Sequence, residues 1–192
     1  MASWPVAMTA WSKMTTSVDI VSSATPLNIL KQQGYHKLIE TFGTNTELYK
    51  SLFFGFRNGS LGETSTILLV LGGLFLIYKK YIFWETPVFM IGTVGLLTWI
   101  FGPFGMFTGD PLFHMMAGGL VIGAFFMATD MVTVPITRKG QIIFAIGCGV
   151  LTTLIRLKGG YPEGVCYSIL LMNVVTPLID RFVQPVKYGT RG

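Results

Sequence analysis

The sequence predicts an all-α integral membrane protein with five transmembrane helices, preceded by a polar segment outside the membrane. Charged residues make up only 12% of the 192-residue chain, against roughly 25% in soluble domains. Hydrophobic residues make up 51% and the mean hydropathy is +0.59. A soluble fold of this size buries only roughly 70% of the surface of its unfolded chain. The surplus apolar surface needs a lipid bilayer, which excludes a soluble enzyme.

Five segments approach the length of about 20 apolar residues that a membrane-spanning helix needs. They are Thr64–Phe83, Pro87–Phe107, Leu112–Thr129, Gln141–Leu157 and Val165–Phe182. Recurrent small residues, such as Gly72-Gly73, Gly118-Gly119 with Gly123, and Gly147 with Gly149, favour close helix packing. The alternative is the close approach of a flat ligand. We therefore divide the chain into an outer segment (residues 1–60), a five-helix domain (61–184) and a tail (185–192).

The basic residues predict the orientation of the five spans. Only Arg156 and Lys158 lie near the loops after the second and fourth spans. The loops after the first, third and fifth spans carry Lys79, Lys80, Arg138, Lys139, Arg181, Lys187 and Arg191. Because positive charge accumulates on the inside, we expect a cytoplasmic C-terminus and an outer segment on the opposite face. Basic residues spread between apolar runs also argue against a nucleic-acid partner.

The first residues are unusual for a complete membrane protein. Met1–Trp11 is apolar but too short to span a bilayer, and no basic residue precedes it as in a signal peptide. We expect the sequence to be the C-terminal part of a longer membrane protein.

The outer segment contains one stretch whose residue types suggest a chemical role, Asp19 to Leu27. Its ordinary interpretation is a helix start, with Thr25 as N-cap and Pro26 in the first turn. The helical spacing of the apolar residues then extends an amphipathic helix to about Phe42. A helix N-terminus also suits a phosphate, because its free N–H groups and dipole favour negative charge. The hydroxyls of Ser22, Ser23 and Thr25 precede that terminus.

This stretch resembles the flavinylation motif, in which Asp, two residues, Ser or Thr, one residue, Ala and Ser or Thr follow in order. Asp19, Ser22, Ala24 and Thr25 fit every fixed position, with Ser23 between them. The following Pro26-Leu27 resembles the D subunits of Rnf electron-transport complexes (the RnfD/NqrB family). Further similar segments are Gly62–Ser65, Gly109–His114, Gly123–Asp130, Tyr161–Val165, Met172–Asn173 and Thr176–Asp180. The resemblance thus covers nearly all of the chain.

The chain departs from the family in two ways. It lacks the spanning helices that precede the motif in family members, and Met131 stands where Pro is expected after Asp130. The related B subunit of the sodium-pumping NADH:quinone reductase usually has Gly at the position of Ser23 and lacks the Pro-Leu after Thr25. The D subunit is therefore favoured and the B subunit is the alternative.

The resemblance implies a function and its cofactors. FMN would be attached by a flavin transferase through its phosphate to Thr25, and a second, non-covalent flavin, riboflavin, would lie among the helices. The chain would carry electrons with the other Rnf subunits, between reduced ferredoxin and NAD⁺, coupled to Na⁺ or H⁺ transport. The location implied is a bacterial or archaeal cell membrane, with Thr25 on the outer face.

Four acidic residues near the span ends are further candidates, because ionisable groups there are often functional. We expect Asp110 and Glu163 at the outer end, in contact with the flavin, and Asp130 and Asp180 at the inner end, along an ion path. Helix capping, solvation or ion pairing is the ordinary alternative for each. His114 lacks the partners of a metal site.

Two other classes of protein fit parts of the sequence. Glycine-rich helices with acidic ends also suit a transporter or channel component, and Thr25 could be the helix cap of a structural scaffold. Both alternatives predict a protein without bound flavin.

Overall fold

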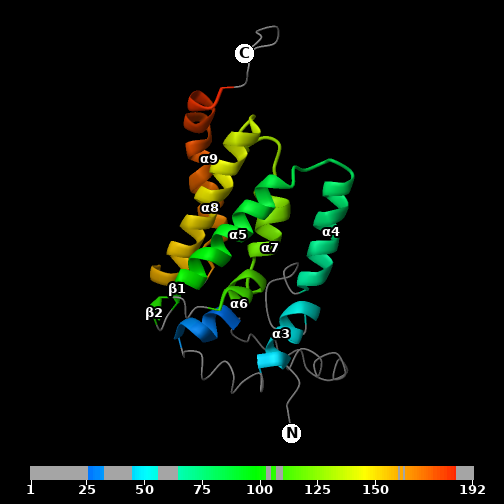
Figure 1. Ribbon diagram of the computed structural model, residues 1–192, viewed down its shortest axis with the longest axis vertical. Helices are drawn as coiled ribbons and strands as arrows, with labels where there is room; N and C mark the ends of the chain where they lie inside the picture. Colours follow the sequence, from blue (N-terminus) through cyan, green and yellow to red (C-terminus); the bar gives the residue numbers. More distant parts are fainter. Residues whose placement is uncertain are drawn as a thin grey trace, which may run out of the picture.

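A computed structural model of the chain describes residues 26–32, 45–55, 65–102, 105–106, 110–159, 161 and 163–184. The described part is a bundle of helices whose longer members run along one axis (Figure 1). Residues 26–32 form a helical segment across one end of it. The other elements are α3 (Asn45–Phe54), α4 (Thr66–Tyr78), α5 (Glu85–Ile100), β1 (Phe101–Gly102), β2 (Gly105–Met106), α6 (Pro111–Met116), α7 (Leu120–Ile122), the π-helical turn η1 (Gly123–Met127), α8 (Arg138–Lys158) and α9 (Val165–Phe182).

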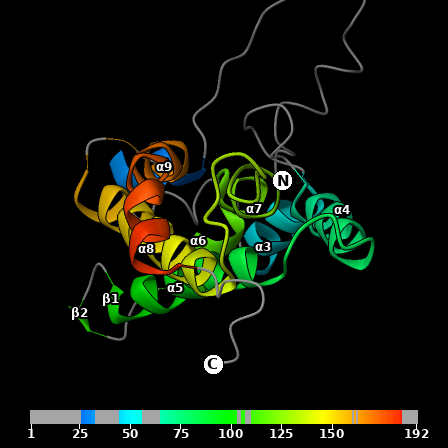
Figure 2. The same cartoon turned by 90° about the horizontal axis from the view of Figure 1, so that it is seen from above.

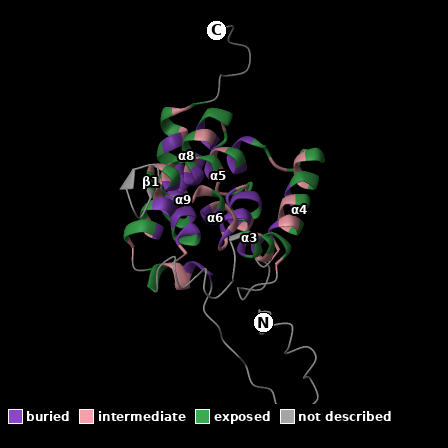
Figure 3. Cartoon of the chain, turned by 60° about the horizontal axis from the view of Figure 1, so that its bottom comes forward, coloured by how far each residue is buried: buried purple, intermediate pink, exposed green. Residues whose placement is uncertain are grey.

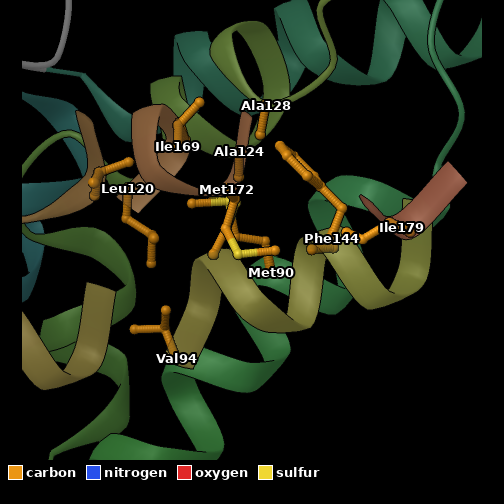
Figure 4. Packing of buried hydrophobic residues seen from close by; sticks show 12 residues of the cluster. Met90, Val94, Leu120, Ala124, Ala128, Phe144, Ile169, Met172 and Ile179 are labelled. Atoms are coloured by element: carbon orange, nitrogen blue, oxygen red, sulfur yellow. The ribbon is translucent and has the colours of Figure 1, made fainter. Parts of the chain in front are cut away.

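The main core lies between α5, α8, α9 and the α7–η1 segment (Figure 4). Its buried residues include Met90, Leu120, Phe144 and Met172. The glycines predicted to allow close packing do so: a methyl group at Gly147 would lie 2.8 Å from the sulfur of Met172. Side chains from neighbouring helices occupy the corresponding space at Gly73 and Gly123 as well. The packing interpretation is therefore confirmed for Gly73, Gly123 and Gly147.

The helical prediction is confirmed at the level of the fold class. Of the described helices, α8, with 21 residues, and α9, with 18, are long and apolar enough to cross a membrane by length and composition. The apolar helices α4 and α5 are shorter, with 13 and 16 residues. Their outward faces carry large exposed hydrophobic side chains such as Leu68, Phe75 and Leu96. Figure 3 shows this exposed surface surrounding a buried centre.

The second predicted span, Pro87–Phe107, extends beyond the end of its helix. Helix α5 ends at Ile100, and Phe101–Gly102 pairs with Gly105–Met106 in a short antiparallel hairpin. The reason lies in the sequence, because proline at position 103 disfavours the helical conformation of the residue before it and lacks a backbone N–H. In the first predicted span, Thr64–Phe83, the apolar part ends near Tyr78, and α4 ends at that residue; Lys80 follows with a positive φ of 59°.

The third predicted span, Leu112–Thr129, is not one helix. It is divided into α6, α7 and η1, and the break lies at Ala117–Gly119. Ala117 is extended (ψ 140°) and Gly118 has a φ of +71°, a conformation that favours glycine. Apolar composition predicted a span here but could not show where the backbone unwinds.

The last two predicted spans agree with the structure. Helix α9 covers Val165–Phe182, the predicted range, although Pro177 lies inside it. Helix α8 begins at Arg138, three residues before the predicted start at Gln141. Its earlier start is explained by Thr137, whose hydroxyl oxygen accepts a hydrogen bond from the Gly140 N–H at 3.1 Å.

Candidate functional site

The bundle has two chemically different ends. We call the end that carries Leu27, Asp110 and Glu163 the motif end, and the end that carries Glu85, Asp130 and Asp180 the far end. In Figure 1 the motif end lies at the bottom, beside α3 and α6, and the far end at the top, where α9 finishes.

The attachment motif itself, Asp19, Ser22, Ser23, Ala24 and Thr25, lies outside the described residues. Its immediate continuation is described and is firmly packed. Leu27 is 4% exposed and belongs to a second hydrophobic cluster with Leu48, Leu52, Phe113 and Ala117. The residues that follow the motif are therefore anchored to α3 and α6. The remainder of the predicted amphipathic helix, up to Phe42, also lies outside the described residues.

Leu27 packs against Gly118, at the break between α6 and α7. A methyl group at Gly118 would lie 2.6 Å from Leu27 Cδ1, 3.3 Å from Arg156 Nη2 and 3.5 Å from Glu163 Cγ. Gly118 therefore leaves the space that Leu27 fills. Three segments far apart in the sequence, near residues 27, 118 and 156–163, meet at this point.

Arg156 closes the break between α6 and α7. Its guanidinium is buried, and its Nη1 and Nη2 donate hydrogen bonds to His114 O (2.6 Å) and Ala117 O (3.2 Å). Both carbonyls lie at the C-terminal end of α6. Because the helix breaks there, they lack the backbone N–H partners that a continuous helix would supply. A cation is also favoured there by the helix dipole. The unwound turn is thus stabilised from α8, 39 residues or more along the chain.

The helical segment 26–32 is held near both of its ends. Leu27, near its start, belongs to the cluster of α3 and α6 side chains. Lys31, near its end, donates hydrogen bonds from Nζ to Gly159 O and to Tyr161 O, the latter at 2.8 Å. The segment therefore connects the α3 and α6 cluster with the α8–α9 connection.

Asp110 joins α3 to α6. Its Oδ1 accepts a hydrogen bond from the Phe113 N–H at 3.3 Å, which caps α6. Its Oδ2 accepts a hydrogen bond from the Tyr49 hydroxyl. Glu163 lies partly buried beside Gly118, with its Cγ 3.5 Å from the position of an added methyl group there. Both acidic residues predicted near the motif therefore lie at the motif end, and Asp110 contributes to its architecture.

A shallow groove lies on α3, next to Met116 at the end of α6. Its volume is about 410 Å³. We call it the α3 groove, and its lining residues are Thr46, Tyr49, Lys50, Phe53, Phe54 and Met116. Tyr49 and Met116 also pack against the cluster that contains Leu27. The groove and Leu27, which follows the motif, are thus joined by one hydrophobic cluster.

The far end holds its acidic residues differently. Asp180 Oδ1 accepts a hydrogen bond from the Ile136 N–H at 3.1 Å, and Asp130 Oδ1 accepts one from the Val132 N–H at 3.5 Å. Asp130 lines a cavity of about 290 Å³. The buried Glu85 pairs with Arg138 at 3.4 Å between Oε1 and Nη1. Both aspartates thus accept hydrogen bonds from the loop between η1 and α8, Asp130 from within it and Asp180 from α9.

Sequence reasoning missed several residues of the motif end. It treats Arg156 as a loop charge and gives Lys31, Tyr49 and Gly118 no contact with the motif. One signal for Arg156 exists, because an arginine within an apolar helix needs a buried partner. The partner carbonyls could not be found from sequence, since they depend on the break in the third span. No group of three or more His, Cys, Asp or Glu residues suited to a metal lies within the described ranges.

The fold and site together define a helical protein of membrane composition, with an anchored segment directly after the Asp19–Thr25 stretch. The sequence matches the NQR2, RnfD, RnfE family model over residues 1–189, and the chain belongs to this family.

The chain is 77% identical over 193 residues to the D subunit of the proton-translocating ferredoxin:NAD(+) oxidoreductase complex of Clostridium ljungdahlii, covering 100% of this chain and 58% of that protein. It is 46% identical over 191 residues to the D subunit of the Na(+)-translocating complex of Acetobacterium woodii (98% and 55%). It is 50% identical over 138 residues to the D subunit of the ion-translocating oxidoreductase complex of Stutzerimonas stutzeri (71% and 39%). The chain thus spans little more than half the length of the first two relatives, and the preference for a D subunit is confirmed.

Proposed function

We propose that this chain is part of the membrane electron-carrier subunit of an Rnf-type ferredoxin:NAD⁺ oxidoreductase that couples electron transfer to Na⁺ or H⁺ translocation. The observation that carries this proposal is the 77% identity, over the whole chain, to the D subunit of the proton-translocating complex of Clostridium ljungdahlii. The other subunits of such a complex and the lipid bilayer are the partners.

FMN esterified to Thr25 is the proposed cofactor, attached by a flavin transferase. The flavin supplies the redox chemistry when bound, and the protein positions it and controls its surroundings. The described residues fit this role, because Leu27 is anchored two residues after Thr25 in the space left by Gly118. Riboflavin is the proposed second flavin.

We place the five helical segments α4, α5, α6–α7–η1, α8 and α9 across the membrane, with the motif end outside and the C-terminus in the cytoplasm. Their exposed apolar faces suit lipid or neighbouring subunits. Arg156, one of the two basic residues counted near the outer loops, is buried against backbone carbonyls. Without Arg156, fewer basic residues lie near the outer loops, and the charge asymmetry that predicts the orientation becomes larger.

The test uses membrane vesicles that contain the complete complex with the full-length protein. Thr25→Ala should abolish ion uptake driven by reduced ferredoxin and NAD⁺, because the attachment hydroxyl is lost. Thr25→Ser is the matched control and should retain uptake, because serine keeps the hydroxyl. Coupled uptake at the wild-type rate in Thr25→Ala would contradict the proposed function.

A further inference from the structure

We propose that the α3 groove binds the isoalloxazine ring of the flavin attached to Thr25. This inference rests on the flavin attachment proposed above, and it assigns the ring to residues outside the attachment motif. Three observations carry it: the hydrophobic cluster that Leu27 shares with the groove, the aromatic lining of the groove, and the placement of its polar side chains.

The segment that follows the attachment point shares a hydrophobic cluster with the groove. Leu27 belongs to this cluster together with Leu48 and Leu52 of α3. The groove residues Tyr49 and Met116 pack against the same cluster. Because only Pro26 separates Thr25 from Leu27, the attachment point is two residues from a side chain that shares its cluster with the groove.

The lining of the groove suits a flat aromatic ring. Phe53 is 40% exposed and Phe54 is 56% exposed. Their rings are perpendicular, with centroids 5.5 Å apart and an interplanar angle of 89°. A ring system can stack on one phenyl group and meet the edge of the other. The thioether of Met116 adds a polarisable surface at the same groove.

The polar side chains of the groove match the charge of a flavin. The exposed Lys50 supplies a positive charge that favours an anionic phosphate or an electron-rich ring. The Tyr49 hydroxyl is held by Asp110 Oδ2, so its ring has a fixed position. Asp110 is then a positioning residue that acts through Tyr49, rather than the flavin contact expected from the sequence. A mainly apolar pocket with a few placed polar groups is typical of cofactor sites.

The experiment uses the full-length protein in its complex, produced together with the flavin transferase. The variants are Phe53→Ala and Lys50→Met, and Phe53→Tyr preserves an aromatic face. Phe182→Ala and Lys79→Met are matched controls, because both residues are exposed and lie at the far end. The readouts are iodide quenching of the covalent flavin's fluorescence, its midpoint potential, and the mass of the Thr25 peptide.

Phe53→Ala should increase iodide quenching severalfold, because the ring loses its stacking partner, and Phe53→Tyr should restore the wild-type value. Lys50→Met should shift the midpoint potential to a more negative value, since a cation near the ring favours the added electrons. The controls and the peptide mass should not change.

Unchanged quenching and potential in both groove variants, with Thr25 still modified, would overturn this inference alone. The groove would then be covered by lipid or by another protein of the complex. An unmodified Thr25 in the wild-type complex would overturn both this inference and the attachment on which it rests.

Discussion

The motif end and the far end each hold two of the acidic residues singled out in the sequence, but they hold them in different ways. At the motif end, Asp110 caps α6 and binds Tyr49, and Glu163 borders Gly118. At the far end, Asp130 lies beside a cavity and bonds the backbone two residues away. Viewed along the bundle, α5, α8 and α9 gather into one group and α4 stands at its side (Figure 2).

Because of this difference, substitutions at the motif end test the packing of the fold, and substitutions at the far end test ion movement. Contacts at the motif end join segments more than 60 residues apart, such as Tyr49 with Asp110 and Lys31 with Gly159. A substitution there disturbs the packing of the segment that follows the motif. The far-end aspartates make exposed hydrogen bonds that contribute little to stability, so their substitution reports more directly on ion movement.

The largest expected effect is that of Arg156→Met. It removes the two charge-assisted hydrogen bonds to His114 O and Ala117 O and leaves these carbonyls without that donor. We expect a loss of about 3 kcal/mol in the free energy of unfolding. Thermal unfolding of the detergent-solubilised complex measures it, and Arg156→Lys should lose less. An unchanged unfolding temperature in Arg156→Met would show that the break is stable without the arginine.

Gly118→Ala should have the next largest effect. Its φ of +71° costs an L-residue about 1–2 kcal/mol, and its methyl group would press on Leu27 at 2.6 Å. We expect lower stability and less flavin on Thr25, measured by unfolding and peptide mass spectrometry. Gly92→Ala is the matched control, because nothing lies within 4 Å of its added methyl group. Equal behaviour of the two variants would refute the anchoring role of Gly118.

Tyr49→Phe should have a moderate effect. It removes only the hydroxyl that donates to Asp110 Oδ2, while Oδ1 can still cap α6. We expect a loss of about 1 kcal/mol in the free energy of unfolding, measured by thermal unfolding of the same complex. A loss as large as that of Arg156→Met would mean that this bond, and not the buried arginine, dominates the motif end.

Asp130→Asn and Asp180→Asn should affect stability least. The amide oxygen can replace the carboxylate as acceptor from Val132 and Ile136, so we expect a change within about 0.5 kcal/mol. If these residues line an ion path, ferredoxin-driven Na⁺ or H⁺ uptake should fall. Asp110→Asn and Glu163→Gln are measured in parallel. Wild-type coupling in all four variants would exclude an ionic role for these carboxylates.

How far the fold could be predicted depends on what ends each helix. Helix α9 matches its predicted range, with Gly164 directly before it and proline at position 185 shortly after it, whereas α5 was predicted too long because hydropathy ignores proline at position 103. The break at Ala117–Gly119 was missed because its stability depends on Arg156, which comes from another helix. Gly118 and Gly119 were visible, but glycine pairs also occur in continuous packed helices.

The candidate site divides in the same way. Asp110 and Glu163 could be assigned to one end because they lie beside predicted spans, and the structure places them at the motif end. The roles of Tyr49, Lys31 and Arg156 could not be predicted, because each depends on a long-range contact with a partner in a distant segment.

Whether Thr25 carries FMN is the most direct test of the proposed electron carrier. The full-length protein, from cells that contain the flavin transferase, is run on a denaturing gel under ultraviolet light beside Thr25→Ala. Peptide mass spectrometry of residues 14–31 accompanies the gel. We predict fluorescence that survives denaturation, a mass gain of FMN less water on Thr25, and loss of both in the variant. A dark band with unmodified Thr25 would contradict the proposal and leave the motif as a helix cap.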